Sequence, residues 1–326
     1  MKNRFWLLGL LAFVWSCSSP EQTAETKTEP VPVKEYPKFN ADSAYAYIQA
    51  QVDFGPRVPG TAAHTNAKNW VLEKFSSYGF EVQTQDFQTK THDGLTWNLS
   101  NIIASHNPEI KKRILLSAHW DTRRFADKDT ERIDEPILGA NDGGSGVAVL
   151  LEIARQIGTQ DLKPDVGIDI ILFDGEDDGE PEYSTTQNNS QIWWCLGSQH
   201  WSKNKHVAGY SAYYGILLDM VAGKGARFYR EGYSRKYASG ILKKVWDNAA
   251  KIGQGDFFMN RDSPEIMDDH LFVNEFAGIP MIDIIEFSPD YGFGQYHHKH
   301  SDNMDLIDKR TMQAVGETVL FTIYQE

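Results

Sequence analysis

From residue 113 to the end of the chain, short and mostly apolar runs without polar alternation are separated by helical patterns. The apolar runs cover residues 113–118, 166–173, 214–219 and 280–287. The helical patterns cover residues 145–157, 196–204, 240–252, 270–277 and 309–324. Strands without polar alternation are buried on both faces, and helices between them provide the crossovers of a parallel sheet. The sequence therefore predicts an α/β fold whose central sheet is mixed but mostly parallel, with helices on both faces.

The part of the chain before residue 113 predicts two helices and two further strands. The first helical pattern begins after a possible cap at Asn40 or Asp42 and ends at Val52, and the second covers residues 65–78. The β-rich segments follow at 80–90 and 96–104. A turn at 92–94 joins these segments, so we expect antiparallel strands at the edge of the sheet. Because residues 36–326 contain no repeats and no second linker, the sequence predicts that they form a single domain.

The N-terminus is typical of a secretion signal. Lys2 and Arg4 precede an apolar run of eleven residues, 5–15, which is too short to span a hydrocarbon core of about 30 Å as a helix. Residues 14–17 resemble a bacterial lipoprotein processing site, which would place a lipid on Cys17; without it the protein is simply exported. Residues 18–35 are rich in Ser, Thr, Glu, Pro and Lys, which predicts a flexible tether. We therefore expect a signal peptide at 1–17 and an exported, periplasmic protein that contacts a membrane only through Cys17.

Charge and cysteine content exclude some classes of protein. The chain has 32 Lys and Arg residues against 45 Asp and Glu residues, a net charge of -13. Such a surface repels a polyphosphate backbone, so nucleic acid is not an expected partner. Two cysteines are too few for a disulfide-based scaffold or a Cys-rich zinc module.

Carboxylates and imidazoles follow several of the predicted strands. Because parallel strands end at one edge of a sheet, the loops after them should lie close together. The loops that carry such side chains lie at 119–122, 139–146, 174–178, 219 and 286–300.

Each of these loops has a simpler explanation when it is taken alone. Acidic residues after strands are usually solvated turns, and Asp142 could be only the N-cap of the helix at 145. The three histidines at 297, 298 and 300 could lie on the surface. The Gly-rich loop at 139–146 lacks the spacing of a phosphate-binding loop, and residues 174–180 lack the order of a calcium loop. These explanations do not account for the convergence of all the loops on one edge.

A bound cation would explain that convergence, because buried like charges are unfavourable unless they are neutralised. Carboxylates with imidazole and no thiolate suit Zn²⁺ in an open site with about three protein ligands. Glu176 and Asp177 are neighbours on an extended segment, so their side chains should point in different directions. One of them can then bind metal while the other acts as a general acid and base.

Several motifs together resemble the zinc-dependent exopeptidase superfamily, which contains secreted aminopeptidases and glutaminyl cyclases. The motifs are His119-x-Asp121, Gly139-Ala140-Asn141-Asp142, Asp174-Gly175-Glu176-Asp177, Leu218-Asp219-Met220, Asp268-Asp269-His270 and His298-x-x-x-Asp302-Asn303. Within this superfamily, residues 117–123, 196–201 and 268–270 resemble the glutaminyl cyclases in particular.

The resemblance implies a zinc-dependent catalytic domain at 36–326 and a glutaminyl-peptide cyclotransferase. Such an enzyme converts the N-terminal glutamine of a peptide or protein to pyroglutamate and releases ammonia. The resemblance implies one Zn²⁺, with Glu176 as the acid and base that moves the proton. The implied zinc ligands are Asp142, Asp177 and His298. Asp219 and Asp268 are implied to form a hydrogen-bonded pair that supports Glu176.

The sequence departs from the family pattern at two positions. Asp177 is shorter than the glutamate that often occupies this place, and His297 stands where animal cyclases carry tryptophan. Trp193 and Trp194 are our candidates for the pocket wall that binds substrate, although both could simply pack in the core.

An alternative function stays open. In a di-zinc aminopeptidase, His119 and Asp219 would bind a second Zn²⁺, Asp142 would bridge both ions and Glu176 would activate water.

Overall fold

The computed structural model describes residues 32–184 and 191–326. One compact unit spans Lys34–Glu326. The predicted signal peptide at 1–17 and most of the predicted tether at 18–35 lie outside the described residues. Within the described ranges, no helix is both long and apolar enough to cross a membrane.

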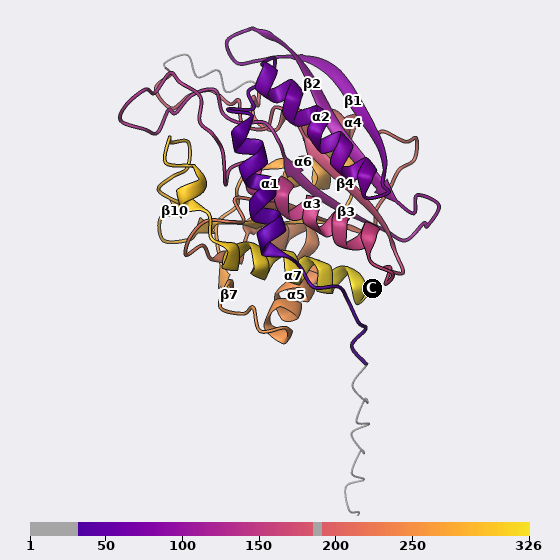
Figure 1. Cartoon of the computed structure of the whole chain (residues 1–326). Helices are drawn as coiled ribbons and strands as arrows, with labels where there is room; N and C mark the ends of the chain where they lie inside the picture. Colours follow the sequence, from indigo (N-terminus) through magenta and orange to yellow (C-terminus); the bar gives the residue numbers. More distant parts are fainter. Residues whose placement is uncertain (1–31, 185–190) are drawn as a thin grey trace, which may run out of the picture. The chain divides into compact units, whose positions relative to one another are not determined.

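A six-stranded sheet forms the centre of this unit (Figure 1). Its strands, in spatial order, are β1 (Glu81–Lys90), β2 (Thr96–His106), β4 (Gly167–Phe173), β3 (Arg113–His119), β5 (Tyr214–Asp219) and β8 (Met281–Ile285). The four strands β4, β3, β5 and β8 are mutually parallel, whereas β2 runs antiparallel to both of its neighbours, β1 and β4. The predicted mixed, mostly parallel sheet is confirmed. The expectation of two edge strands is wrong for β2, which pairs with both β1 and β4 and is buried along most of its length.

Helices cover both faces of the sheet, as predicted. The larger core cluster joins one face to α1 (Ala41–Asp53), α2 (Ala62–Ser77), α3 (Gly144–Thr159), α5 (Gly232–Lys251) and α7 (Lys309–Tyr324). A smaller cluster joins the other face to α4 (Leu196–Lys203) and to the π-helical turn η1 (Val273–Ala277). Because successive side chains of a strand point to opposite faces, Leu116 packs in the larger cluster and its neighbour Leu115 in the smaller one.

The remaining elements are short. They are β6 (Phe228–Arg230) paired with β7 (Phe258–Asp262), the hairpin of β9 (Phe287–Ser288) and β10 (Gly292–Phe293), α6 (Asp269–Phe272) and the 3-10 turn η2 (Met304–Leu306).

Two of the helices differ from their predicted ranges. The helix predicted at 240–252 is the second segment of α5, which a kink at Ala238 (φ -139°, ψ 37°) divides in two. The first segment was not predicted; the Glu231 carboxylate caps its start at Gly232 by accepting hydrogen bonds from the backbone N–H groups of Tyr233 and Ser234. The helix predicted at 270–277 is only four residues of α-helix, α6, followed by the π-helical turn.

Candidate active site

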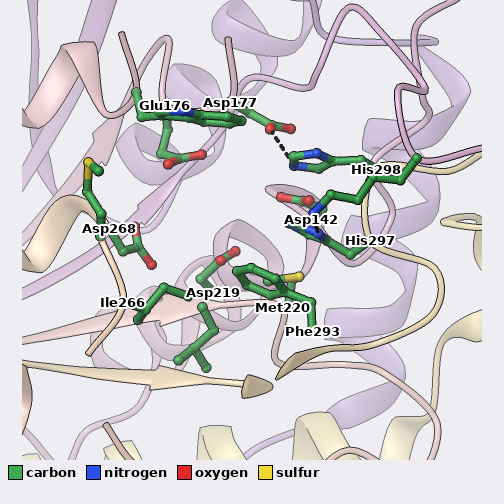
Figure 2. A pocket seen from close by; sticks show the side chains of 14 residues that line it. Asp142, Glu176, Asp177, Asp219, Met220, Ile266, Asp268, Phe293, His297 and His298 are labelled. Carbon is green, nitrogen blue, oxygen red and sulfur yellow. Dashed lines mark hydrogen bonds and ion pairs between the residues drawn. The ribbon is translucent and has the colours of Figure 1, made fainter. Parts of the chain in front are cut away.

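The loops at the carboxyl ends of the parallel strands meet around one pocket (Figure 2). The predicted site residues that line it are Asp142, Glu176, Asp177, Trp194, Asp219, Asp268 and His298. Trp193 is half-buried and does not line it. The remaining lining residues form a largely apolar wall and one cationic group: Met220, Ile266, Met267, Ile285, Phe293, His297 and Lys128. The loops thus converge as the sequence predicts.

The loop before α3 presents Asp142 to the pocket. Gly143, with φ of 77°, is the N-cap residue and makes no side-chain cap, so Asp142 is not the helix cap that we considered as its simpler explanation. Instead, the buried Asp302 carboxylate accepts hydrogen bonds from the backbone N–H groups of Asn141 (2.7 Å) and Asp142 (3.0 Å). A Cβ on Gly146 would lie 2.3 Å from the Leu218 carbonyl oxygen, so this glycine lets α3 approach β5 closely.

The loop after β4 is held in a similar way. The buried Asp121 carboxylate accepts hydrogen bonds from the backbone N–H groups of Glu176 (3.1 Å) and Asp177 (3.2 Å). Asp177 faces His298 in Figure 2, while the Glu176 carboxylate lies on the Asp268 side of the pocket. The two neighbouring acids therefore diverge, as predicted for an extended segment.

His298 lies between two carboxylates. Its Nε2 is 3.3 Å from Asp177 Oδ1 and its Nδ1 is 3.3 Å from Asp127 Oδ1. Asp127 in turn accepts two hydrogen bonds from the Arg123 guanidinium, at 2.7 and 2.6 Å. A histidine with a carboxylate behind its second nitrogen is typical of a metal ligand, because the carboxylate fixes the tautomer and orients the ring.

Aromatic rings also hold His298 in place. Its ring stacks between Trp194, at a centroid distance of 5.7 Å, and His297, at 3.8 Å. His297 and His298 are 8% and 4% exposed, so they are not the surface histidines considered as an alternative. Lys128 Nζ lies 2.7 Å from His297 Nδ1. The donor atoms of Asp142, His297 and His298 lie within 4.8 Å of one another. Because the Lys128 ammonium beside His297 would repel a cation, the geometry favours Asp177, 3.3 Å from His298 Nε2, over His297 as the partner of a metal held by His298.

A second group of donor atoms shares Asp142. His119 Nε2 lies 3.1 Å from Asp142 Oδ1 and 3.3 Å from Asp219 Oδ1. The donor atoms of His119, Asp142 and Asp219 all lie within 4.8 Å of one another. The residues predicted for a second metal are therefore brought together too.

The donor set fits a divalent metal ion. Among the described residues, Asp177 Oδ2 is buried without a hydrogen-bond partner, and both ring nitrogens of His119 face carboxylate oxygens without forming a hydrogen bond of normal geometry. Burial, followed by repulsion from Asp142, raises the pKa of Asp177, and burial raises the pKa of Asp219 to about 7. A cation would relieve this repulsion, and carboxylate oxygens with imidazole nitrogens are ligands that Zn²⁺ accepts.

The sequence reasoning missed the roles of three acids. Asp121 and Asp302 stand in the quoted motifs, but nothing in their spacing shows that they bind backbone N–H groups. Asp127 lies outside every motif, and its only sequence signal is that Arg123 stands four residues before it.

Comparisons with known proteins agree with this geometry. The model of peptidase family M28 matches residues 101–323. The chain belongs to peptidase family M28. It is 50% identical to a glutaminyl cyclase of Bacteroides thetaiotaomicron whose crystal structure has N-acetylhistamine bound, with a TM-score of 0.86 over 90% of this chain and 100% of that one.

Two further relatives bear on the activity. Bovine glutaminyl-peptide cyclotransferase is 30% identical over 293 residues, covering 80% of this chain and 76% of its own. A structure described as a leucine aminopeptidase precursor, also from Bacteroides thetaiotaomicron, is 49% identical with a TM-score of 0.86, covering 90% of this chain and 100% of that one. The motif resemblance to the bacterial glutaminyl cyclases is confirmed.

Proposed function

We propose that this M28 family member is a zinc-dependent glutaminyl-peptide cyclotransferase. The observation that carries the proposal is the position of Glu176, a carboxylate that lies in one pocket with Asp142, Asp177 and His298 but diverges from them. A proton carrier beside a metal-binding group is what the cyclisation of glutamine needs. The similarity to two glutaminyl cyclases supports the same activity.

In this proposal Asp142, Asp177 and His298 would hold one Zn²⁺. A bound ion would supply a Lewis acid for the γ-carbonyl group of the substrate glutamine and for the negative charge that develops on its oxygen. Asp127 orients His298, while Asp121 and Asp302 fix the backbone of the two loops that supply the carboxylates.

Glu176 moves the proton. The substrate's α-amino group attacks its own γ-carbonyl carbon, so one C–N bond forms and the bond to the amide nitrogen breaks. Glu176 takes a proton from the attacking amine and returns it to the departing ammonia. Burial raises the pKa of Glu176 well above its ordinary value, which brings it closer to the pKa of an α-amine, about 7.7–8.0, and favours proton transfer between them.

Asp219, Asp268 and Trp194 complete the site. Burial raises the pKa of Asp219 to about 7, so near neutral pH this carboxyl retains a proton part of the time and can donate a hydrogen bond. Ligand atoms of Asp268 and Glu176 lie within 4.8 Å of each other, which places Asp268 to support Glu176. Trp194 provides an aromatic wall for the folded glutamine side chain, whose ring closes within one molecule.

One observation favours a second candidate function. His119, Asp142 and Asp219 could hold a second Zn²⁺, and Glu176 would then activate water in an aminopeptidase that removes N-terminal residues. The aminopeptidase description of one relative supports this alternative.

A paired assay separates the two functions. Purified protein is given one peptide that begins with glutamine and one that begins with leucine, and products are identified by mass spectrometry with zinc measured in parallel. We expect the first peptide to lose one ammonia, the second to stay intact and about one zinc per chain to be bound. Free leucine with about two zinc ions per chain would refute the proposal in favour of the aminopeptidase.

We also propose that the protein is exported to the periplasm and attached to a membrane through a lipid on Cys17. The charged, then apolar pattern of residues 1–17 supports this proposal.

A further inference from the structure

A buried thiol touches the proposed proton carrier. Cys195 is fully buried, and its Sγ lies 3.1 Å from Glu176 Oε1 as a hydrogen-bond donor. In the described ranges, 32–184 and 191–326, no other side chain donates a hydrogen bond to this carboxylate. We propose that Cys195 is a positioning residue that holds the Glu176 carboxylate in its working orientation.

The backbone fixes the sulfur in place. Cys195 N–H donates to the Glu176 carbonyl oxygen and Leu196 N–H to the Gly175 carbonyl oxygen, both at 3.0 Å. Cys195 adopts a left-handed conformation, with φ of 57°, at the position just before α4. A non-glycine residue rarely adopts this conformation, so the surrounding contacts must hold it there. The loop of Glu176 and the start of α4 therefore form one rigid unit.

The thiol leaves one carboxylate oxygen available for proton transfer. It binds Oε1, whereas Oε2 is 4.0 Å from His119 Nδ1. Burial, followed by repulsion from the neighbouring Glu176 charge, raises the pKa of Cys195 well above its ordinary value. The sulfur therefore keeps the proton that it donates, and its contact with Glu176 orients the carboxylate without occupying the second oxygen.

This inference rests on the proposed function, since it assigns Cys195 a task in moving the proton. Cys195 does not line the pocket, so its loss should not weaken substrate binding or zinc binding. The expected effect is therefore a lower kcat with an unchanged KM.

The S–H···O contact can be tested without any activity measurement. The chain has two cysteines, Cys17 and Cys195, so a Cys17→Ser background leaves Cys195 as the only thiol. In this background we compare the infrared S–H stretching band with and without Glu176→Gln. At a pH at which Glu176 is ionised, we expect the band to move to higher frequency in the glutamine variant, because an amide oxygen accepts a weaker hydrogen bond than a carboxylate.

A matched control comes from α4. Ser202 is buried in this helix and, among the described residues, its hydroxyl has no hydrogen-bond partner. Ser202→Ala should leave the S–H band where it is. A band that stays unmoved in Glu176→Gln would overturn the inference, whether or not the protein is a cyclase.

Kinetics then test the consequence. Cys195→Ala should lower kcat on a glutamine-initiated peptide about 2- to 10-fold, the worth of one ordinary hydrogen bond, with KM and bound zinc unchanged. Cys195→Ser keeps a donor and should recover most of the lost kcat, and Ser202→Ala should match the wild type. A wild-type kcat in Cys195→Ala would overturn the inference, whereas a wild type that forms no pyroglutamate would overturn the proposed function instead.

Discussion

Replacing Glu176 with glutamine tests the proton-transfer role most directly. The amide has nearly the same shape and can still accept the Cys195 hydrogen bond, but it cannot carry a proton between the amine and the leaving ammonia. General acid–base catalysis contributes about 10²- to 10⁴-fold, so kcat should fall by about that factor, or about 2.7–5.4 kcal/mol of transition-state stabilisation. KM and bound zinc should hardly change, because Glu176 diverges from Asp177 and is not among the proposed ligands.

The same variant changes how stability depends on pH. Because burial raises the pKa of Glu176, its neutral form is favoured in the folded protein. The stabilisation from the neutral carboxyl is complete below the pKa of the unfolded chain, about 4.3, and is lost as pH rises through the higher folded value. The metal-free wild type should therefore lose more stability on going from acid to neutral pH than metal-free Glu176→Gln.

Three measurements check this prediction: steady-state pyroglutamate formation, zinc content, and thermal melts of the chelated proteins across this pH range. Near-normal turnover in a folded, zinc-loaded Glu176→Gln would refute the proton-carrier role. If the melting temperatures of the two proteins depended on pH in the same way, the conclusion that burial raises the pKa of Glu176 would be refuted.

Three other changes have defined outcomes. Asp142→Ala should abolish both zinc binding, measured by elemental analysis, and turnover, because the donor atoms of Asp142 lie close to those of His298 on one side and of His119 and Asp219 on the other; retained zinc would disprove this ligand assignment. Asp127→Ala should weaken zinc binding about 10- to 100-fold in a chelator competition, because His298 loses the carboxylate that orients it. An unchanged affinity would mean that stacking on Trp194 and His297 is enough to orient the His298 ring. Cys17→Ser should move the protein from the membrane fraction to the soluble fraction, and unchanged partitioning would argue against the lipid anchor.

The sheet and the location of the site could be predicted because both depend on local sequence signals. Apolar runs such as 166–173 can only be buried strands, and parallel strands bring their terminal loops together. Asp142, Asp177 and His298 follow from this rule together with the family motifs. The prediction missed only the first segment of α5, before the kink at Ala238: it has no apolar periodicity, and Glu231 could not be recognised as its cap.

Contacts between distant residues account for what the sequence did not reveal. Asp121 binds backbone groups 55 and 56 positions away, and Cys195 meets Glu176 across 19 positions. No periodicity encodes such pairs, because they arise from how loops fold at the sheet edge. The same limit explains why the sequence could not distinguish Trp193 from Trp194. Only Trp194 lines the pocket.

The hydrogen bonds of Asp121 and Asp302 have a consequence for how the enzyme is assembled. Both acids accept hydrogen bonds from backbone N–H groups of the loops that carry the proposed ligands. The conformation of these loops is therefore held by the polypeptide itself. Small metalloproteins often fold only on loading. Here the hydrogen bonds of Asp121 and Asp302 come from the chain itself, so they would help both loops to fold whether or not zinc is bound.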